Sequence, residues 1–195
     1  KFDSVLVYNN FKYRDSEKLG NNLADYAEQG GGVVTMVFES STRLGSTRPL
    51  QGRWKSKNYG VFSSSSSDTR NWNYLGNVLQ KNHPIVKDFN SFKGYYRMNK
   101  KAVANNSTLI ANWKDGIPLV ACRKNNVSVV GLNFYPVSSN ISSNGWDINT
   151  DGWKLMANSL KWVAEGVSSN WISGTPLQSS VLGNKTQDLK LSFNT

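Results

Sequence analysis

The chain contains a single cysteine and a single histidine, the side chains most often used for nucleophilic and metal chemistry. Cys122 lies in the apolar run 118–122, which is typical of a buried, unreactive thiol. His83 stands between Asn82 and Pro84, where a turn with a capping or surface histidine is expected. One cysteine and one histidine cannot form an ordinary zinc site or an intrachain disulfide. The sequence therefore predicts no metal site and no cofactor.

Three aspartates, Asp115, Asp147 and Asp151, fall in expected loops at the ends of strands or helices. Paired carboxylates in one pocket could perform acid–base chemistry on a carbohydrate, so a carbohydrate-active enzyme stays open as an alternative. Asp151 falls in the first turn of an expected helix, where the helix dipole favours a carboxylate. The stretch 144–151 is rich in oxygen ligands, but it lacks the spacing and the terminal Glu of an EF-hand loop.

Aromatic side chains in expected loops are the second group with a functional interpretation. Their rings could stack on sugars or contact another protein, since Tyr and Trp supply rigid amphipathic area. Alternatively they cover the open end of a sheet as a satellite core. The group consists of Trp54, Tyr59, Trp72, Tyr74, Tyr95, Tyr96 and Trp146.

Alternating apolar runs and helical patterns predict the elements that position these side chains. A strand at 2–8, a helix at 16–29 that ends at three glycines, and a strand at 33–38 form one βαβ unit. The polar stretch 39–73 is expected to form an ordered loop or short hairpin. Three further strands and a final helix follow at 108–113, 117–122, 127–134 and 151–164.

Ligands of open α/β sheets bind at the carboxyl ends of the strands. Tyr8, Phe38 and Tyr135 end three of the expected strands, so we expect a ligand pocket at these residues. The loop tryptophans Trp54, Trp72 and Trp146 complete the set of candidate ligand-binding residues.

The net charge of +10 suits acidic partners in principle, but the basic residues are scattered. Their densest cluster is at 97–101, and no basic helix or basic-aromatic motif accompanies it. The sequence therefore disfavours nucleic acid as a partner.

No apolar stretch is long enough to span a membrane. Five N-x-[ST] sequons are candidate glycosylation sites and favour an extracellular or cell-surface location: Asn105, Asn106, Asn126, Asn140 and Asn184.

Taken in order, six segments resemble the class I glutamine amidotransferase-like fold, closest to its trehalose-utilisation-like branch, which occurs in large secreted microbial proteins. The segments are FDSVLVYNN, LADYAEQGGGVVTMVF, NHPIVKDFNSF, TLIANWKDGIPLVAC, VVGLNFYPVSS and DGWKLMANSLKWVAEG. The resemblance implies a flavodoxin-like parallel sheet flanked by helices over residues 1–166, without the family's first strand, helix and strand. Residues 167–195 then form a β-strand tail, a linker or the start of a further β-domain.

The same resemblance locates the family's catalytic positions. The nucleophilic cysteine matches Val37, and the histidine and glutamate match Tyr135 and Val137. Valine has no titratable group, and a tyrosine with a pKa near 10 is a poor base at neutral pH. The resemblance therefore implies a domain without amidotransferase activity.

These observations favour a non-catalytic module of an extracellular or cell-surface protein, used for assembly, adhesion or glycan contact. Expected partners are glycans, or another chain or another copy that pairs with the N-terminal edge of the sheet and with residues 170–195.

Overall fold

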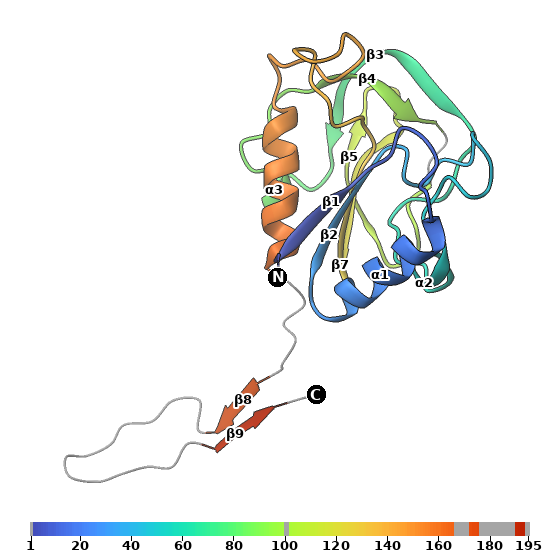
Figure 1. Ribbon diagram of the computed structural model, residues 1–195. Helices are drawn as coiled ribbons and strands as arrows, with labels where there is room; N and C mark the ends of the chain where they lie inside the picture. Colours follow the sequence, from blue (N-terminus) through green and yellow to red (C-terminus); the bar gives the residue numbers. More distant parts are fainter. Residues whose placement is uncertain (1, 100–101, 166–171, 176–189, 194–195) are drawn as a thin grey trace, which may run out of the picture.

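The structure is a computed structural model that describes residues 2–99, 102–165, 172–175 and 190–193. Seven strands of the described residues form one sheet in the order β1-β2-β7-β6-β5-β3-β4 (Figure 1). The bounds are β1 Ser4–Val7, β2 Gly32–Met36, β3 Asp68–Val78, β4 Lys93–Met98, β5 Thr108–Trp113, β6 Pro118–Lys124 and β7 Ser128–Leu132. The helices are α1 Ser16–Glu28, α2 Gly52–Ser56, α3 Gly152–Ala164 and the 3-10 helix η1 Pro84–Val86.

The N-terminal part of the sheet is the predicted βαβ unit. Strand β1 pairs in parallel with β2, and β2 pairs in parallel with β7. Helix α1 connects β1 to β2, and the side chain of Asp15 caps its first turn by accepting a hydrogen bond from Lys18 N at 2.8 Å. Gly30 then adopts a positive φ of 85°, which a glycine tolerates and which turns the chain into β2.

The rest of the sheet is antiparallel, so the prediction of a parallel sheet is wrong beyond β7. The pairs β7–β6, β6–β5, β5–β3 and β3–β4 are all antiparallel. The tight turns after β5 and β6 explain this, because a connection of a few residues can join only antiparallel strands. The architecture is therefore α/β with a mixed sheet, and the flavodoxin-like arrangement is not confirmed.

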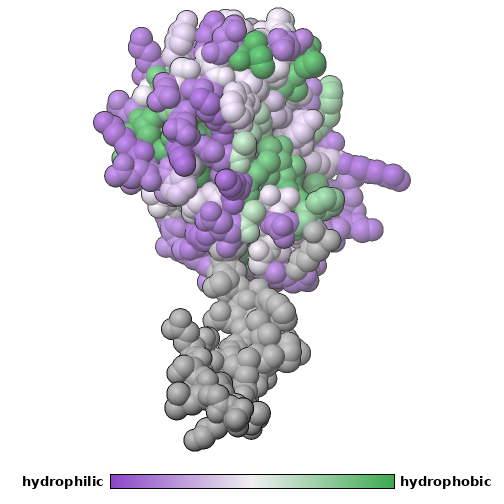
Figure 2. Space-filling view, turned by 90° about the vertical axis from the view of Figure 1, so that its left-hand side faces the viewer, coloured by the Kyte–Doolittle hydropathy of each residue, from purple (hydrophilic) through white to green (hydrophobic). Residues whose placement is uncertain are grey.

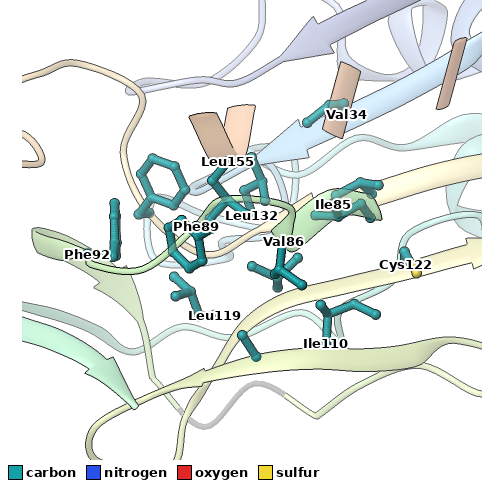
Figure 3. Close-up of a cluster of buried hydrophobic side chains, with 14 of the residues drawn as sticks. Val34, Ile85, Val86, Phe89, Phe92, Ile110, Leu119, Cys122, Leu132 and Leu155 are labelled. Carbon is teal, nitrogen blue, oxygen red and sulfur yellow. The ribbon is translucent and has the colours of Figure 1, made fainter. Parts of the chain in front are cut away.

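Helices cover both faces of the sheet, with α3 on one face and α1 and α2 on the other (Figure 1). Because side chains alternate along a strand, β2 sends Val34 and Met36 towards α3 and Val33 towards α1. The larger core lies on the α3 side, where residues of η1, β5, β6 and β7 pack together (Figure 3). Gly32 permits this packing, since a Cβ there would lie 2.3 Å from the carbonyl oxygen of Val163 in α3.

Strands β3 and β4 are the main elements that the sequence analysis does not predict. They pair as an antiparallel ribbon, with an irregular register between Arg70 and Asn73. Strand β3 starts inside the stretch 39–73, which was expected to form a loop or short hairpin, and the turn of α2 lies in the same stretch. The polar composition of β3 gives no apolar run by which a strand is recognised.

Strands β8 Ile172–Thr175 and β9 Lys190–Phe193 form a separate antiparallel pair. This agrees with the expected strand pattern near the end of the chain. The remaining residues of the tail lie outside the described residues, as does the expected boundary at residue 166, so the division into 1–166 and 167–195 stays a prediction. Within the part of the chain that the structure describes, no helix is both long enough and apolar enough to span a membrane.

Candidate functional site

Three of the predicted site residues meet at the carboxyl ends of the parallel strands. Tyr8, Phe38 and Tyr135 follow β1, β2 and β7 closely in sequence, so their side chains reach the same edge of the sheet. The ring centroids of Tyr8 and Tyr135 lie 6.0 Å apart in a T-shaped arrangement, and those of Phe38 and Tyr135 lie 6.1 Å apart. Such distances are those of interacting aromatic pairs.

Tyr96 of β4 completes this aromatic group. Its ring centroid lies 5.9 Å from that of Phe38 and 6.0 Å from that of Tyr135. The buried side chain of Asn133 fixes β4 in this place, because its Oδ1 accepts from Met98 N at 2.8 Å and its Nδ2 donates to Met98 O at 3.0 Å. Nothing in the sequence pattern pairs β4 with the end of β7, so sequence reasoning misses the role of Tyr96 here.

Two adjoining hollows open around these rings, and we call them together the strand-end pocket. Both are bordered by Asn10, Phe38 and Tyr96. The first hollow has a volume of about 240 Å³ and is also lined by Phe11, Arg43, Leu44, Arg48, Asp68 and Arg70. The second has a volume of about 300 Å³ and is also lined by Tyr135, Val137, Ile141, Ser142 and Asn144. One half of the pocket is therefore basic, and the other is aromatic and uncharged.

A buried arginine forms the floor of the basic half. The guanidinium of Arg48 donates to Asn10 O at 2.7 Å and to Ser41 Oγ at 3.1 Å, and its Cζ lies 4.5 Å from the centre of the Phe38 ring. Burial lowers the pKa of Arg48 from its usual value, while the negative charge of Asp68 opposes this effect. Arg48 is fixed by these contacts and keeps a positive charge at neutral pH.

Two more arginines share one carboxylate at the rim. The side chain of Asp68 is almost fully buried; it forms an ion pair with Arg43, and Arg70 Nε approaches it at 3.6 Å. The side chains of Arg43 and Arg70 are 43% and 55% exposed, so both can turn towards a ligand. Neither arginine was predicted, because they stand in polar stretches without periodicity.

The residues at the amidotransferase positions lie around the same pocket. Val37 is buried against Phe38 and Met98, and Tyr135 and Val137 line the aromatic hollow. Burial, together with the neighbouring hydroxyls of Tyr8 and Tyr96, raises the pKa of Tyr135, so its hydroxyl remains protonated at neutral pH. Among the described residues that line the two hollows, Asp68 is the single carboxylate, and the two arginines engage it.

The three loop aspartates have partners away from this pocket. Asp115 pairs with Arg97 at 2.7 Å, and Asp147 pairs with Lys93 at 3.1 Å. Hydrogen bonds from Asn149 and Lys93 lower the pKa of Asp147. Neither aspartate lines either hollow of the strand-end pocket.

Asp151 joins the start of α3 to the segment before β4. Its Oδ2 accepts from the backbone N–H groups of Asn90 and Ser91, both at 3.0 Å, and its Oδ1 pairs with Lys154 at 2.8 Å. Burial opposes ionisation, but these hydrogen bonds outweigh it and lower the pKa of Asp151. It too lies outside the hollows, and the described residues contain no group of three or more His, Cys, Asp or Glu side chains that could hold a metal ion.

The predicted tryptophans lie elsewhere. Trp54 is buried in the core on the α1 side, and Trp146 is buried on the α3 side, where its Nε1 donates to Pro136 O at 2.9 Å. Trp72 is partly exposed on β3 beside Tyr95 and Lys93. None of the three lines the strand-end pocket. The interpretation of the loop aromatics as a satellite core therefore fits Trp54 and Trp146.

Four of the five sequon asparagines are exposed: Asn105, Asn106, Asn126 and Asn140. Asn184 lies outside the described residues. Their use as glycosylation sites stays a prediction.

In the basic cluster at 97–101, Arg97 is buried beside Trp113 and Asp115, and Lys100 and Lys101 lie outside the described residues.

No family model matches the chain, and no curated protein matches it in sequence. Solved structures do match the fold. Cytoplasmic protein STM3548 from Salmonella typhimurium has a TM-score of 0.56 at 11% identity, over 82% of this chain and 70% of that protein. A ThuA-like protein from Bacteroides uniformis has a TM-score of 0.52 at 14% identity, over 81% and 68%. Cytoplasmic protein STM1381 from Salmonella typhimurium LT2 has a TM-score of 0.50 at 14% identity, over 67% and 60%.

These similarities concern the fold. The match to a ThuA-like protein supports the resemblance to the trehalose-utilisation-like branch at the level of architecture. The predicted extracellular or cell-surface location is contradicted, because both Salmonella proteins are cytoplasmic.

Proposed function

We propose that the chain is a binding module without amidotransferase activity, and that the strand-end pocket is its binding site. The observation that carries the proposal is the convergence of Phe38, Tyr96 and Tyr135 on one concave site. Tyr8 packs against Tyr135 beside this site and does not line either hollow. Aromatic faces are suited to stacking on a flat or ring-shaped ligand such as a sugar. With valines at positions 37 and 137, the site lacks the cysteine and the glutamate of the amidotransferase pattern.

The arrangement of the aspartates supports this proposal over the carbohydrate-active alternative. An acid–base pair needs two carboxylates facing one site with separated pKa values. Asp115, Asp147 and Asp151 instead pair with Arg97, Lys93 and Lys154, which suits a structural role.

The test is a ligand screen by NMR with a matched pair of variants. A panel of monosaccharides and small aromatic compounds is added to the wild-type chain, and amide shift changes are mapped onto the structure. We expect the changes to gather around the strand-end pocket and to be lost in Tyr135→Ala. Tyr74→Ala, which removes an exposed tyrosine of β3, is the control and should bind as wild type does. Shift changes elsewhere, binding that survives Tyr135→Ala, or release of ammonia from glutamine would contradict the proposal.

Assembly is a second candidate function, favoured by the free edge of β1. Within the described residues β1 pairs with β2 on one side, and the exposed side chains of Phe2 and Phe11 flank it. On the side of the molecule where α3 lies in Figure 1, hydrophobic residues gather in a patch among hydrophilic ones (Figure 2). An edge strand of this kind can accept a strand from another chain. Sedimentation equilibrium tests this idea, and a monomer at every concentration up to the solubility limit would contradict self-assembly.

A further inference from the structure

We propose that the ligand of the strand-end pocket carries a compact anionic group, a carboxylate or a phosphate, which binds between Arg43 and Arg70 while its ring lies against Phe38 and Tyr96. This inference rests on the proposed function and adds the chemical class of the ligand. It is drawn from the charges and contacts of the basic hollow.

The basic hollow has more positive than negative charge. Arg43, Arg48 and Arg70 line it together with the single carboxylate of Asp68, and the other lining residues are uncharged. The buried Glu39 follows Phe38 in the chain but lines a different hollow, beside Trp54. A guanidinium binds carboxylates and phosphates through paired N–H donors, so the excess of arginine selects for an anion.

Some N–H donors of the two rim arginines, Arg43 and Arg70, remain available to a ligand. Arg70 Nε lies 3.6 Å from Asp68, which is beyond hydrogen-bond distance, and its Cζ lies 5.7 Å from the centre of the Tyr96 ring. Tyr96 thus holds the Arg70 guanidinium at the border of the two hollows. An anion placed there would lie beside the aromatic ring that both hollows share.

Arg48 has a different part in this arrangement. Because it is buried and bonded to Asn10 and Ser41, it supplies a fixed positive charge beneath the site without changing its conformation. Fixed charge in a partly desolvated hollow attracts an anion more strongly than the same charge in water. The ring of Phe38 lies 4.5 Å from the Arg48 guanidinium carbon and lines both hollows, so it connects this fixed charge to the aromatic half of the pocket.

The experiment compares pairs of ligands in which one member carries an anionic group and the other is its neutral counterpart. The pairs are glucuronate against glucose, glucose 6-phosphate against glucose, and benzoate against benzamide, titrated into the wild-type chain by NMR. We expect the anionic member of a pair to bind at least about tenfold more tightly, since hydrogen bonds to charged groups are the stronger ones. The two sugar pairs distinguish a carboxylate ligand from a phosphate ligand.

A double variant, Arg43→Gln with Arg70→Gln, should abolish this preference while the neutral compounds bind as before. The two side chains are 43% and 55% exposed, but the change also takes both arginine partners from the buried Asp68, so the amide spectrum must first show that the variant keeps the native fold. Lys161→Gln, an exposed site on α3, is the control for a loss of charge. Equal affinity for the members of each pair, or a preference that survives the double variant, overturns the anion proposal and leaves the binding function standing. Failure of all five compounds to bind overturns both.

Discussion

The Sγ atom of Cys122 lies 3.7 Å from Nε2 of His83, so the one thiol and the one imidazole of the chain meet beside β6. A thiol beside an imidazole can act as a nucleophile with its base, but here the proton of the imidazole lies on the nitrogen that would have to accept the thiol proton. His83 Nδ1 accepts a hydrogen bond from Ile85 N at 3.3 Å, which assigns the proton of the neutral ring to Nε2. The nitrogen that faces the sulfur is therefore a donor and cannot take the proton of the thiol.

Cys122 should be unreactive in the folded protein. Burial raises the pKa of its thiol to about 11, so almost no thiolate is present near pH 8. We expect iodoacetamide to modify the native chain far more slowly than the unfolded chain, as followed by mass spectrometry. Modification of the folded chain at the rate seen in denaturant would show that the thiol is accessible and ionised.

Acidification should destabilise the protein through His83. Burial lowers the pKa of this ring, so its contribution to stability is present above the unfolded value of about 6.5 and is lost as the pH falls through the folded pKa. His83→Asn keeps an acceptor for Ile85 N–H but does not titrate. Urea denaturation between about pH 7 and pH 5 should show a larger loss of stability for wild type than for the variant. Parallel curves for the two proteins would contradict the assignment.

Asn133 should be among the most sensitive polar positions. Its side chain bonds the backbone of Met98 twice, and its Nδ2 also donates to Pro118 O at 2.9 Å. Asn133→Leu leaves these buried backbone groups without partners and should lower the free energy of unfolding by about 3 kcal/mol. The same change at the exposed Asn77 on β3 is the control, expected to cost less than about 0.5 kcal/mol. Equal effects in urea denaturation would mean that the contacts of Asn133 contribute little.

The elements with strong apolar patterns could be predicted from the sequence. The strands around Val5, Val34 and Val130 and the helix around Leu155 are confirmed, because buried strands and amphipathic helices leave clear periodicities. The predicted strands at 108–113 and 117–122 are confirmed as β5 and β6, but β3 and β4 could not be predicted in the same way. Every residue of Asp68–Val78 is exposed or half-buried, since the strand lies near the edge of the sheet and its register with β4 is irregular.

The site was predictable where it depends on strand ends and not where it depends on loops. Tyr8, Phe38 and Tyr135 followed from the rule that ligands bind at the carboxyl ends of strands. Arg48 and Tyr96 reach the pocket through a long connection and an antiparallel pairing, which a single sequence does not encode in any local pattern. The tryptophans were attractive as exposed platforms, yet Trp54 and Trp146 are buried in the two cores.

The parallel pairing of β2 with β7 joins Val33 to Val129, far along the chain. During synthesis from the N-terminus, β1, α1 and β2 emerge long before the strand that completes their sheet. Until Leu132 has been made, the apolar β2 has a free edge, which is the kind of surface that associates wrongly with other chains. The antiparallel strands β5, β6 and β7 follow one another directly and can form first, because local pairings close faster than distant ones. We therefore expect the parallel pairing of β2 with β7 to form after β5, β6 and β7 have paired, and β2 to need protection from other chains until then.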